Sequence, residues 1–211
     1  MVVSMNKKAL PYVMGALILI PLGGTMYRLG EIILTGHWAF DFNPEIVDRL
    51  PLFLHGLGMV LFLVLGAFQF STKQRIRNQA RHRTLGRIAG FGAILGGVTG
   101  IWMTLLHVEI STPLLLIGRL FFGSAMAVFT VFAIRAAIQG RVSEHRAWII
   151  RAYAIAINAG TFPLFYLPFI LILGEPTPLV DEAFQVAGWM INLTIAEKYL
   201  IGDKRSVGVK I

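Results

Sequence analysis

The chain has 211 residues, of which 56% are hydrophobic and 14% are charged. In soluble domains about a quarter of all residues are charged. The composition of this chain therefore excludes a water-soluble globular domain and indicates a protein largely embedded in lipid. The net charge of +8 would suit nucleic-acid binding in a soluble protein, but the basic residues here occupy short segments between apolar stretches. We therefore expect no nucleic-acid partner. The absence of cysteine excludes disulfides, thiolate metal sites and thiol catalysis.

Six apolar stretches are long enough to cross a bilayer, which requires about 20 residues. They predict helices over about 9–28, 51–70, 88–106, 114–134, 148–173 and 183–201. None of them alternates strictly between apolar and polar residues, as a membrane strand would. We predict an all-α fold, a polytopic transmembrane helical bundle in which residues 1–211 form a single integral membrane domain.

Basic and acidic residues alternate between the segments that join these helices. The segments expected on one side contain Lys7, Lys8, Lys73, Arg75, Arg77, Arg81, Arg83, Arg87, Arg135, Arg141, Arg146, Arg151, Lys204, Arg205 and Lys210. The segments expected on the other side contain Glu31, Asp41, Glu45, Asp48, Glu109, Glu175, Asp181 and Glu182. Because cytoplasmic loops carry the excess of lysine and arginine, we predict a multi-pass protein of a bacterial cytoplasmic (inner) membrane with both termini inside (N-in, C-in).

Two of the predicted helices carry residues that shape packing. Gly92, Gly96 and Gly100 recur every four residues in the third helix. Such small residues let another helix backbone approach closely; the alternative is that a flat cofactor lies against this glycine face. In the fifth helix, Pro163 and Pro168 predict a kink, with nearby Asn and Thr side chains available to satisfy the freed backbone groups.

The sequence offers no spacing typical of a catalytic or metal site. Its histidines and carboxylates do not follow metal-ligand spacings, and it has neither a phosphate-binding glycine loop nor a Gly-x-Ser-x-Gly elbow. We predict no catalytic residues and no metal site, so a non-catalytic protein is favoured and an enzyme is left open. A proton-coupled transporter is not favoured because no buried acidic residue is expected.

Four histidines sort by depth into two pairs. His55 and His107 lie near the outer ends of the second and third helices, and His82 and His145 precede the third and fifth helices on the inner side. Two imidazoles from different helices at similar depth could ligate a b-type haem, so the two pairs could carry electrons across the membrane. However, His82 and His107 are 25 residues apart, or about 37 Å along a straight helix. The inner pair would therefore lie at or beyond the membrane surface.

The inner segments contain two similar basic runs, NQARHRTLGR at 78–87 and SEHRAWIIR at 143–151. Arg83 and Arg87 are spaced i, i+4 and share one helix face. With Arg146 and Arg151 they could form an anion pocket for a phospholipid head group. The alternative is that these residues only mark the inner interface.

One arginine departs from the charge pattern. Arg119, in LLLIGRLFF, lies inside the fourth helix near its outer end. A charge at that depth either reaches back to the surface, pairs with a neighbour such as Glu109, or faces the bundle interior. In the last case Arg119 would be an internal counter-ion for an acidic ligand, including a haem propionate.

Three separated stretches, LHGLGMVLFLVLGAFQF, HRTLGRIAG and EHRAWIIRAYA, resemble the signatures of a bacterial family of predicted multi-helix membrane proteins of unassigned function. The resemblance covers about residues 50–200 and implies a shared architecture but no activity. It emphasises His55, Gln69, His82, Arg83, Gly86, Arg87, His145, Arg146, Trp148 and Arg151. The layout of the histidines is also similar to that of the two-haem cytochrome b proteins that use ascorbate.

These observations predict a non-catalytic helical bundle that binds membrane lipids or partner proteins. It would serve as an accessory subunit of a membrane complex, or associate with further copies of itself. The alternative is a transmembrane electron-transfer protein with haem b as its cofactor and bis-histidine ligation. The residues that would hold this haem are His55, His107, His82, His145 and Arg119.

Overall fold

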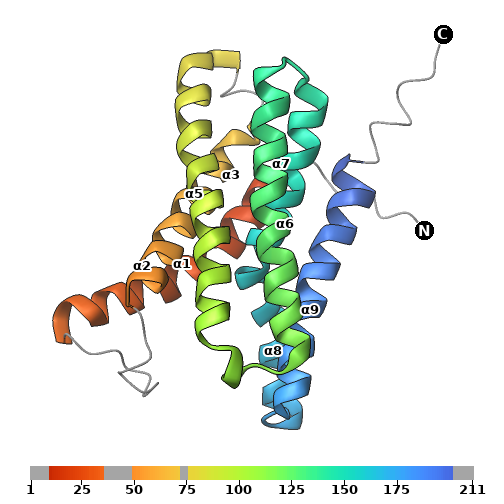
Figure 1. Ribbon diagram of the computed structural model, residues 1–211. Coiled ribbons are helices and arrows are strands. Elements are labelled where there is room, and N and C mark those ends of the chain that lie inside the picture. The colour runs from red at the N-terminus through yellow and green to blue at the C-terminus, as the bar shows by residue number, and fades with distance from the viewer. Residues whose placement is uncertain (1–9, 36–48, 72–75, 202–211) are drawn as a thin grey trace.

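The structure is a computed structural model that describes residues 10–35, 49–71 and 76–201. Within these ranges it contains helices and no strands, which confirms the predicted all-α fold. In chain order (Figure 1) the helices are α1 Leu10–Thr35, α2 Arg49–Val60, the π-helix η1 Leu61–Leu65, α3 Gly66–Gln69, α5 Gln79–Leu106, the 3₁₀ helix η2 Val108–Ile110, α6 Pro113–Ile138, α7 Val142–Ala156, α8 Asn158–Leu173, α9 Pro178–Ile195 and the π-helix η3 Ala196–Ile201.

All six predicted segments are helical over most of the residues that the structure describes, but three helices begin earlier than hydropathy indicates, among them α7, which begins at Val142 rather than at 148. α5 begins at Gln79 rather than at 88, because the Asn78 side chain accepts a hydrogen bond from the Arg81 backbone N–H at 2.9 Å and caps the helix. α9 begins at Pro178 rather than at 183, because proline suits the first helical position. All three helices therefore include charged residues ahead of their apolar stretches.

Among the residues that the structure describes, three helices are long and apolar enough to cross a membrane by length and composition. They are Leu50–Gln69, Gln79–Leu106 and Pro113–Ile138, with mean hydropathies of 2.1, 1.6 and 2.0. α7 and α8 together would make a fourth span, bent by 41°. Six spans and the N-in, C-in orientation stay predictions, and several of the basic residues that support them, among them Lys7, Lys73 and Lys204, lie outside the described residues.

Charge separates to the two ends of the bundle. At one end the start of α5, the end of α6 and the start of α7 meet (Figure 1), and we call this the basic end because it carries Arg77, Arg81, Arg83, Arg87, Arg135, Arg141 and Arg146. At the opposite end α5 turns into α6 and α8 turns into α9; we call this the acidic end because it carries Glu109, Glu175, Asp181 and Glu182. The two ends match the alternation that the positive-inside rule requires.

The buried core lies where the second span, α5, α6 and α7 meet. Its residues include Phe62, Leu63, Ala89, Ala93, Phe122, Met126, Ala152, Tyr153 and Ile155. Alanine and glycine supply most of the buried positions of α5. Such small residues allow the close helix packing that holds membrane bundles together.

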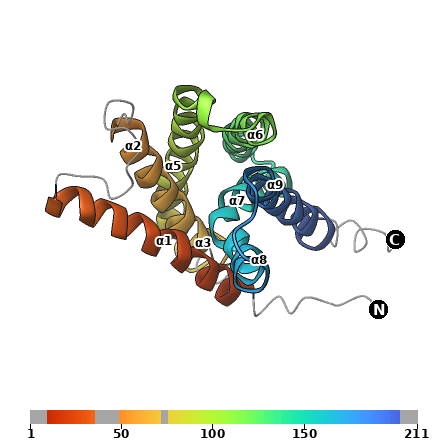
Figure 2. The same cartoon turned by 90° about the horizontal axis from the view of Figure 1, so that it is seen from below.

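The glycine face of α5 is covered by α2, which runs beside it (Figure 2). A Cβ atom added to Gly58 would lie 2.7 Å from the Gly92 carbonyl oxygen and 2.7 Å from the Gly96 nitrogen. These distances are shorter than any normal carbon contact, so the two backbones touch. Farther along, Gly100 lies against the His55 ring. The packing interpretation of these glycines is therefore confirmed, and no space remains along this face for a flat cofactor.

The kink predicted for the fifth span is present, but it lies at Ile157, ahead of Pro163. Thr161 Oγ1 donates to the Asn158 carbonyl at 3.3 Å, as expected for a side chain that satisfies backbone freed by a bend. Asn158 makes a different bond, since its Nδ2 donates to the Gln185 carbonyl of α9 at 3.0 Å. The bend is thus tied to the last span.

We expect Gly92→Ala to destabilise the protein, because its new Cβ would lie 2.7 Å from the Gly58 carbonyl oxygen and force the helices apart. Overpacking of this kind costs about 1–3 kcal/mol, which should lower the melting temperature of the detergent-solubilised protein. Gly24→Ala is the matched control, since a Cβ at Gly24 meets nothing within 4 Å. Equal melting temperatures for the two variants would contradict the backbone contact.

Candidate anion-binding site

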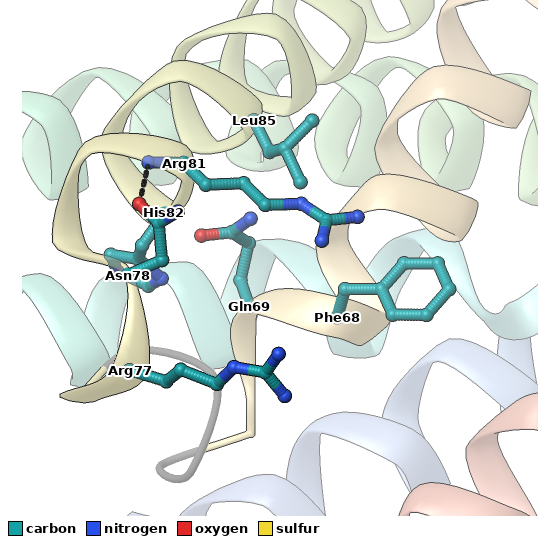
Figure 3. Close-up of a pocket in the computed structure, with 7 residues that line it drawn as sticks. All are labelled: Phe68, Gln69, Arg77, Asn78, Arg81, His82 and Leu85. Carbon is teal, nitrogen blue, oxygen red and sulfur yellow. Dashed lines mark hydrogen bonds between the residues drawn. The ribbon is translucent and has the colours of Figure 1, made fainter.

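A pocket of about 230 Å³ opens at the basic end, between the end of α3 and the start of α5 (Figure 3). It is lined by Phe68, Gln69, Arg77, Asn78, Arg81, His82 and Leu85. Pockets for drug-sized ligands measure about 300–1,000 Å³. The smaller size here suits a compact group such as a phosphate.

Local sequence explains how α3 and α5 form these walls. Because Asn78 caps α5, the first two turns of the helix present residues 78, 81, 82 and 85 on one face, at the i, i+3, i+4, i+7 spacing. Gly86 has no side chain, and a Cβ there would lie 3.4 Å from Gln69 Oε1. The end of α3 can therefore lie directly against α5, with Gln69 packed over Gly86.

The pocket is positively charged. Figure 3 shows the Gln69 carboxamide between the side chains of Arg77 and Arg81, and none of the seven lining residues is acidic. A guanidinium group keeps its charge at any physiological pH and offers a planar set of N–H donors that matches phosphate and carboxylate oxygens. The N-terminus of α5 adds the positive end of the helix dipole. The arrangement is suited to an anion.

The four arginines predicted to bind a head group are not among the lining residues of this pocket. Arg83 and Arg87 are exposed on α5, and Arg146 is half-buried in α7. Arg151 has an internal partner, since its Nη2 donates to Glu197 Oε2 of η3 at 2.9 Å. A lipid site formed by these four residues stays a prediction.

Two of the predicted haem ligands use one ring nitrogen to join neighbouring helices. His55 Nδ1–H donates to the Gly96 carbonyl of α5 at 2.9 Å. His145 Nδ1–H donates to the Ala133 carbonyl of α6 at 2.9 Å. Because a carbonyl oxygen only accepts hydrogen bonds, both rings carry a proton on Nδ1. Each histidine therefore already holds two helices together.

The other two predicted ligands lie at opposite ends of one helix. His82 lines the pocket in the first turn of α5, and His107 follows the last residue of the same helix. α5 is continuous between them, so the separation of about 37 Å expected from helical rise holds. Within the described part of the chain no three His, Asp or Glu side chains form a group that could hold a metal ion. Haem ligation stays a prediction.

The apolar spans agree with the comparison to protein families. The family described as predicted membrane protein (DUF2306) matches residues 52–200, from α2 to η3. The chain belongs to this family. Its description names a membrane protein and no activity, so the resemblance to a membrane family of unassigned function is confirmed. No curated protein and no solved structure matches the chain, and the likeness to two-haem cytochromes b stays a prediction.

At its acidic end this DUF2306 protein holds a second polar cluster. Arg119 of α6 donates from Nη1 to Ser111 Oγ at 3.3 Å and interacts electrostatically with Glu182 and Asp181 of α9. The Glu182 side chain is buried, and its Oε1 accepts a hydrogen bond from the Thr112 N–H at 3.0 Å. The Thr112 hydroxyl donates to the other carboxylate oxygen. The internal counter-charge of Arg119 is thus supplied by this chain.

Sequence reasoning missed Glu182. The predicted sixth helix begins at 183, which leaves Glu182 in the preceding turn, and no buried acidic residue is expected from the sequence. That expectation is wrong, because α9 begins at Pro178 and carries Glu182 in its second turn against α6. The signal in the sequence is Thr177–Pro178, a typical helix start. Arg119 accordingly interacts with the carboxylates of α9 and not with Glu109, the partner that the sequence suggested as one alternative.

We expect Glu182→Ala to lower the free energy of unfolding by about 2–3 kcal/mol, because it leaves the Thr112 N–H without its acceptor and removes one of the two negative charges that interact with Arg119. Glu182→Gln should cost less, since the amide oxygen still accepts from Thr112. Thermal unfolding in detergent micelles measures both. Glu175→Ala, at an exposed turn position, is the control and should change stability by no more than about 0.5 kcal/mol. A loss for Glu182→Ala no larger than this would contradict the cluster's role.

Proposed function

We propose that this DUF2306 protein is a six-span protein of the bacterial cytoplasmic membrane, with both termini inside, that binds an anionic lipid head group at its basic end. In this proposal it acts as an accessory subunit of a membrane complex. The observation that carries the proposal is the basic pocket between α3 and α5, with Arg77 and Arg81 in its lining.

Charge complementarity supports an anionic ligand. Arg77 and Arg81 converge on one small pocket, together with the N-terminus of α5, and no lining carboxylate offsets their charge. Basic pockets at this depth of a membrane protein are a recognised site for anionic lipid head groups. Bidentate hydrogen bonds from arginine to phosphate oxygens would hold such a group.

The apolar walls favour a lipid over a free anion. Phe68 and Leu85 line the pocket beside the two arginines, and 50% of the Phe68 surface is exposed on the outside of the apolar span Leu50–Gln69. A free phosphate would leave this ring uncovered. The glycerol and upper acyl chain of a phospholipid would cover it while its phosphate occupies the basic part of the pocket.

The accessory role is supported by the apolar outer surface of α5 and α6. Large side chains exposed on these helices include Phe91, Trp102, Leu105, Ile117, Phe121 and Val128. In a membrane such a surface contacts lipid tails or the helices of another subunit. Partners of this protein would therefore be lipids, other membrane subunits or a second copy.

We expect the double variant Arg77→Ala and Arg81→Ala to bind dioctanoyl phosphatidic acid at least about tenfold more weakly than the parent protein. Hydrogen bonds to charged groups contribute about 1.5–3 kcal/mol each, and about 1.4 kcal/mol is tenfold in affinity. Binding is measured on purified protein in a neutral detergent. Dioctanoyl phosphatidylcholine, which has no net charge, and inorganic phosphate serve as comparison ligands.

The matched control is the double variant Arg135→Ala and Arg141→Ala, which removes the same charge from the basic end outside the pocket lining. It should leave the affinity nearly unchanged. A third pair, Arg83→Ala and Arg87→Ala, tests the arginines predicted from sequence. Loss of binding only in this third pair would overturn the pocket as the site, and equal binding of phosphatidylcholine would overturn recognition by charge.

A further inference from the structure

The span that delivers Phe68 and Gln69 to the pocket is not a regular α-helix. Between α2 and α3 it passes through the π-helix η1, Leu61–Leu65. A π turn accommodates one extra residue and is found frequently at functional sites within α-helices. Each residue of an α-helix corresponds to a rotation of about 100°. Without the π turn, Phe68 and Gln69 would therefore be rotated by about that angle relative to α2.

A side chain from another span hydrogen-bonds to the backbone of the π-helix. Tyr153 of α7 is 3% exposed, and its hydroxyl donates to the Leu63 carbonyl of η1 at 2.8 Å. Within the helix, the Gly66 N–H is shared between the carbonyls of Phe62 and Leu63. Such a donor is divided between two acceptors, and the Tyr153 hydroxyl gives the Leu63 carbonyl a second donor.

The Tyr153 ring also fits the rotation of the span that the π turn η1 produces. A Cβ atom on Gly66 would lie 2.9 Å from Tyr153 Cε2, so the ring occupies the space that a side chain at 66 would need. Phe62 and Phe70 make edge contacts with the same ring, at centroid distances of 5.4 and 5.0 Å. An unbroken α-helix would turn Gly66 away from the ring and bring a residue with a side chain toward it. The ring and the π turn therefore favour each other.

We propose that Tyr153 is a positioning residue that holds the π register of η1 and thereby keeps Gln69 and Phe68 in the anion pocket. The inference deepens the proposed function and depends on it for the identity of the ligand. The link is short: Gln69 follows Gly66 by three residues, and its carboxamide packs over Gly86 of α5. If the π turn is lost, the end of the span rotates, which moves Gln69 away from Gly86 and opens the pocket wall.

Two measurements test this role, and one of them needs no ligand. The chain has no cysteine, so Gln69→Cys together with Gly86→Cys introduces a single thiol pair across the pocket wall. A short bifunctional thiol reagent should link this pair efficiently while Tyr153 is present. Tyr153→Phe, which removes only the hydroxyl, should lower the linking rate several-fold. Without the two cysteines, the same change should weaken binding of dioctanoyl phosphatidic acid several-fold.

Tyr166→Phe is the matched control, because Tyr166 lies in α8, where its ring stacks on Phe162, and it should change neither measurement. Gly66→Ala is a second probe, since its Cβ would displace the Tyr153 ring, and it should reproduce the loss of linking. Unchanged linking in Tyr153→Phe would overturn the inference, even if lipid binding falls. If Tyr153→Phe reduces linking but the parent protein binds no anionic lipid, Tyr153 is upheld as the residue that holds the π register, and only the proposed function is overturned.

Discussion

The contact between the backbones of α2 and α5 at Gly58, Gly92 and Gly96 is the constraint on which the rest of the structure depends. In lipid no hydrophobic effect draws two apolar helices together, so close packing has to do so. α2 continues through η1 into α3, and α5 starts at the basic end. The same contact therefore fixes both walls of the basic pocket relative to each other, although it lies well inside the bundle.

Two irregular stretches of backbone, η1 and the break between α7 and α8, lie inside the bundle and have polar side chains bonded beside them. Water is absent from the bilayer core, so a backbone group freed by a bend needs an internal partner. Tyr153 supplies one for η1 and Thr161 supplies one at the break between α7 and α8, while Asn158 ties that break to α9. Asn192 of α9 donates to Thr161 Oγ1 at 2.8 Å and extends this network. These polar residues are explained by the backbone that they stabilise.

The sequence was sufficient for features that depend on local spacing and insufficient for those that depend on a neighbouring helix. Hydropathy located the helical segments, and the spacing of Gly92 and Gly96 predicted a close backbone contact. The same spacing argument grouped Arg83 and Arg87 on one face of α5, which they share, but neither lines the pocket. Only the position of α3 shows that Arg81 lies on the pocket side. The π turn has no signature in hydropathy, because α and π turns accept the same apolar residues.

Topology explains why arginines lie at the basic end, but not why two of them converge. The positive-inside rule requires positively charged residues in a loop, but it does not specify where their side chains point. Within the described residues, two other arginines have acidic partners: Arg141 pairs with Glu144 at 3.0 Å, and Arg151 of α7 pairs with Glu197. Arg77 and Arg81 instead share a pocket without a carboxylate, where two like charges repel each other. An anion bound between them removes that repulsion, which is the physical reason to regard the pocket as a site.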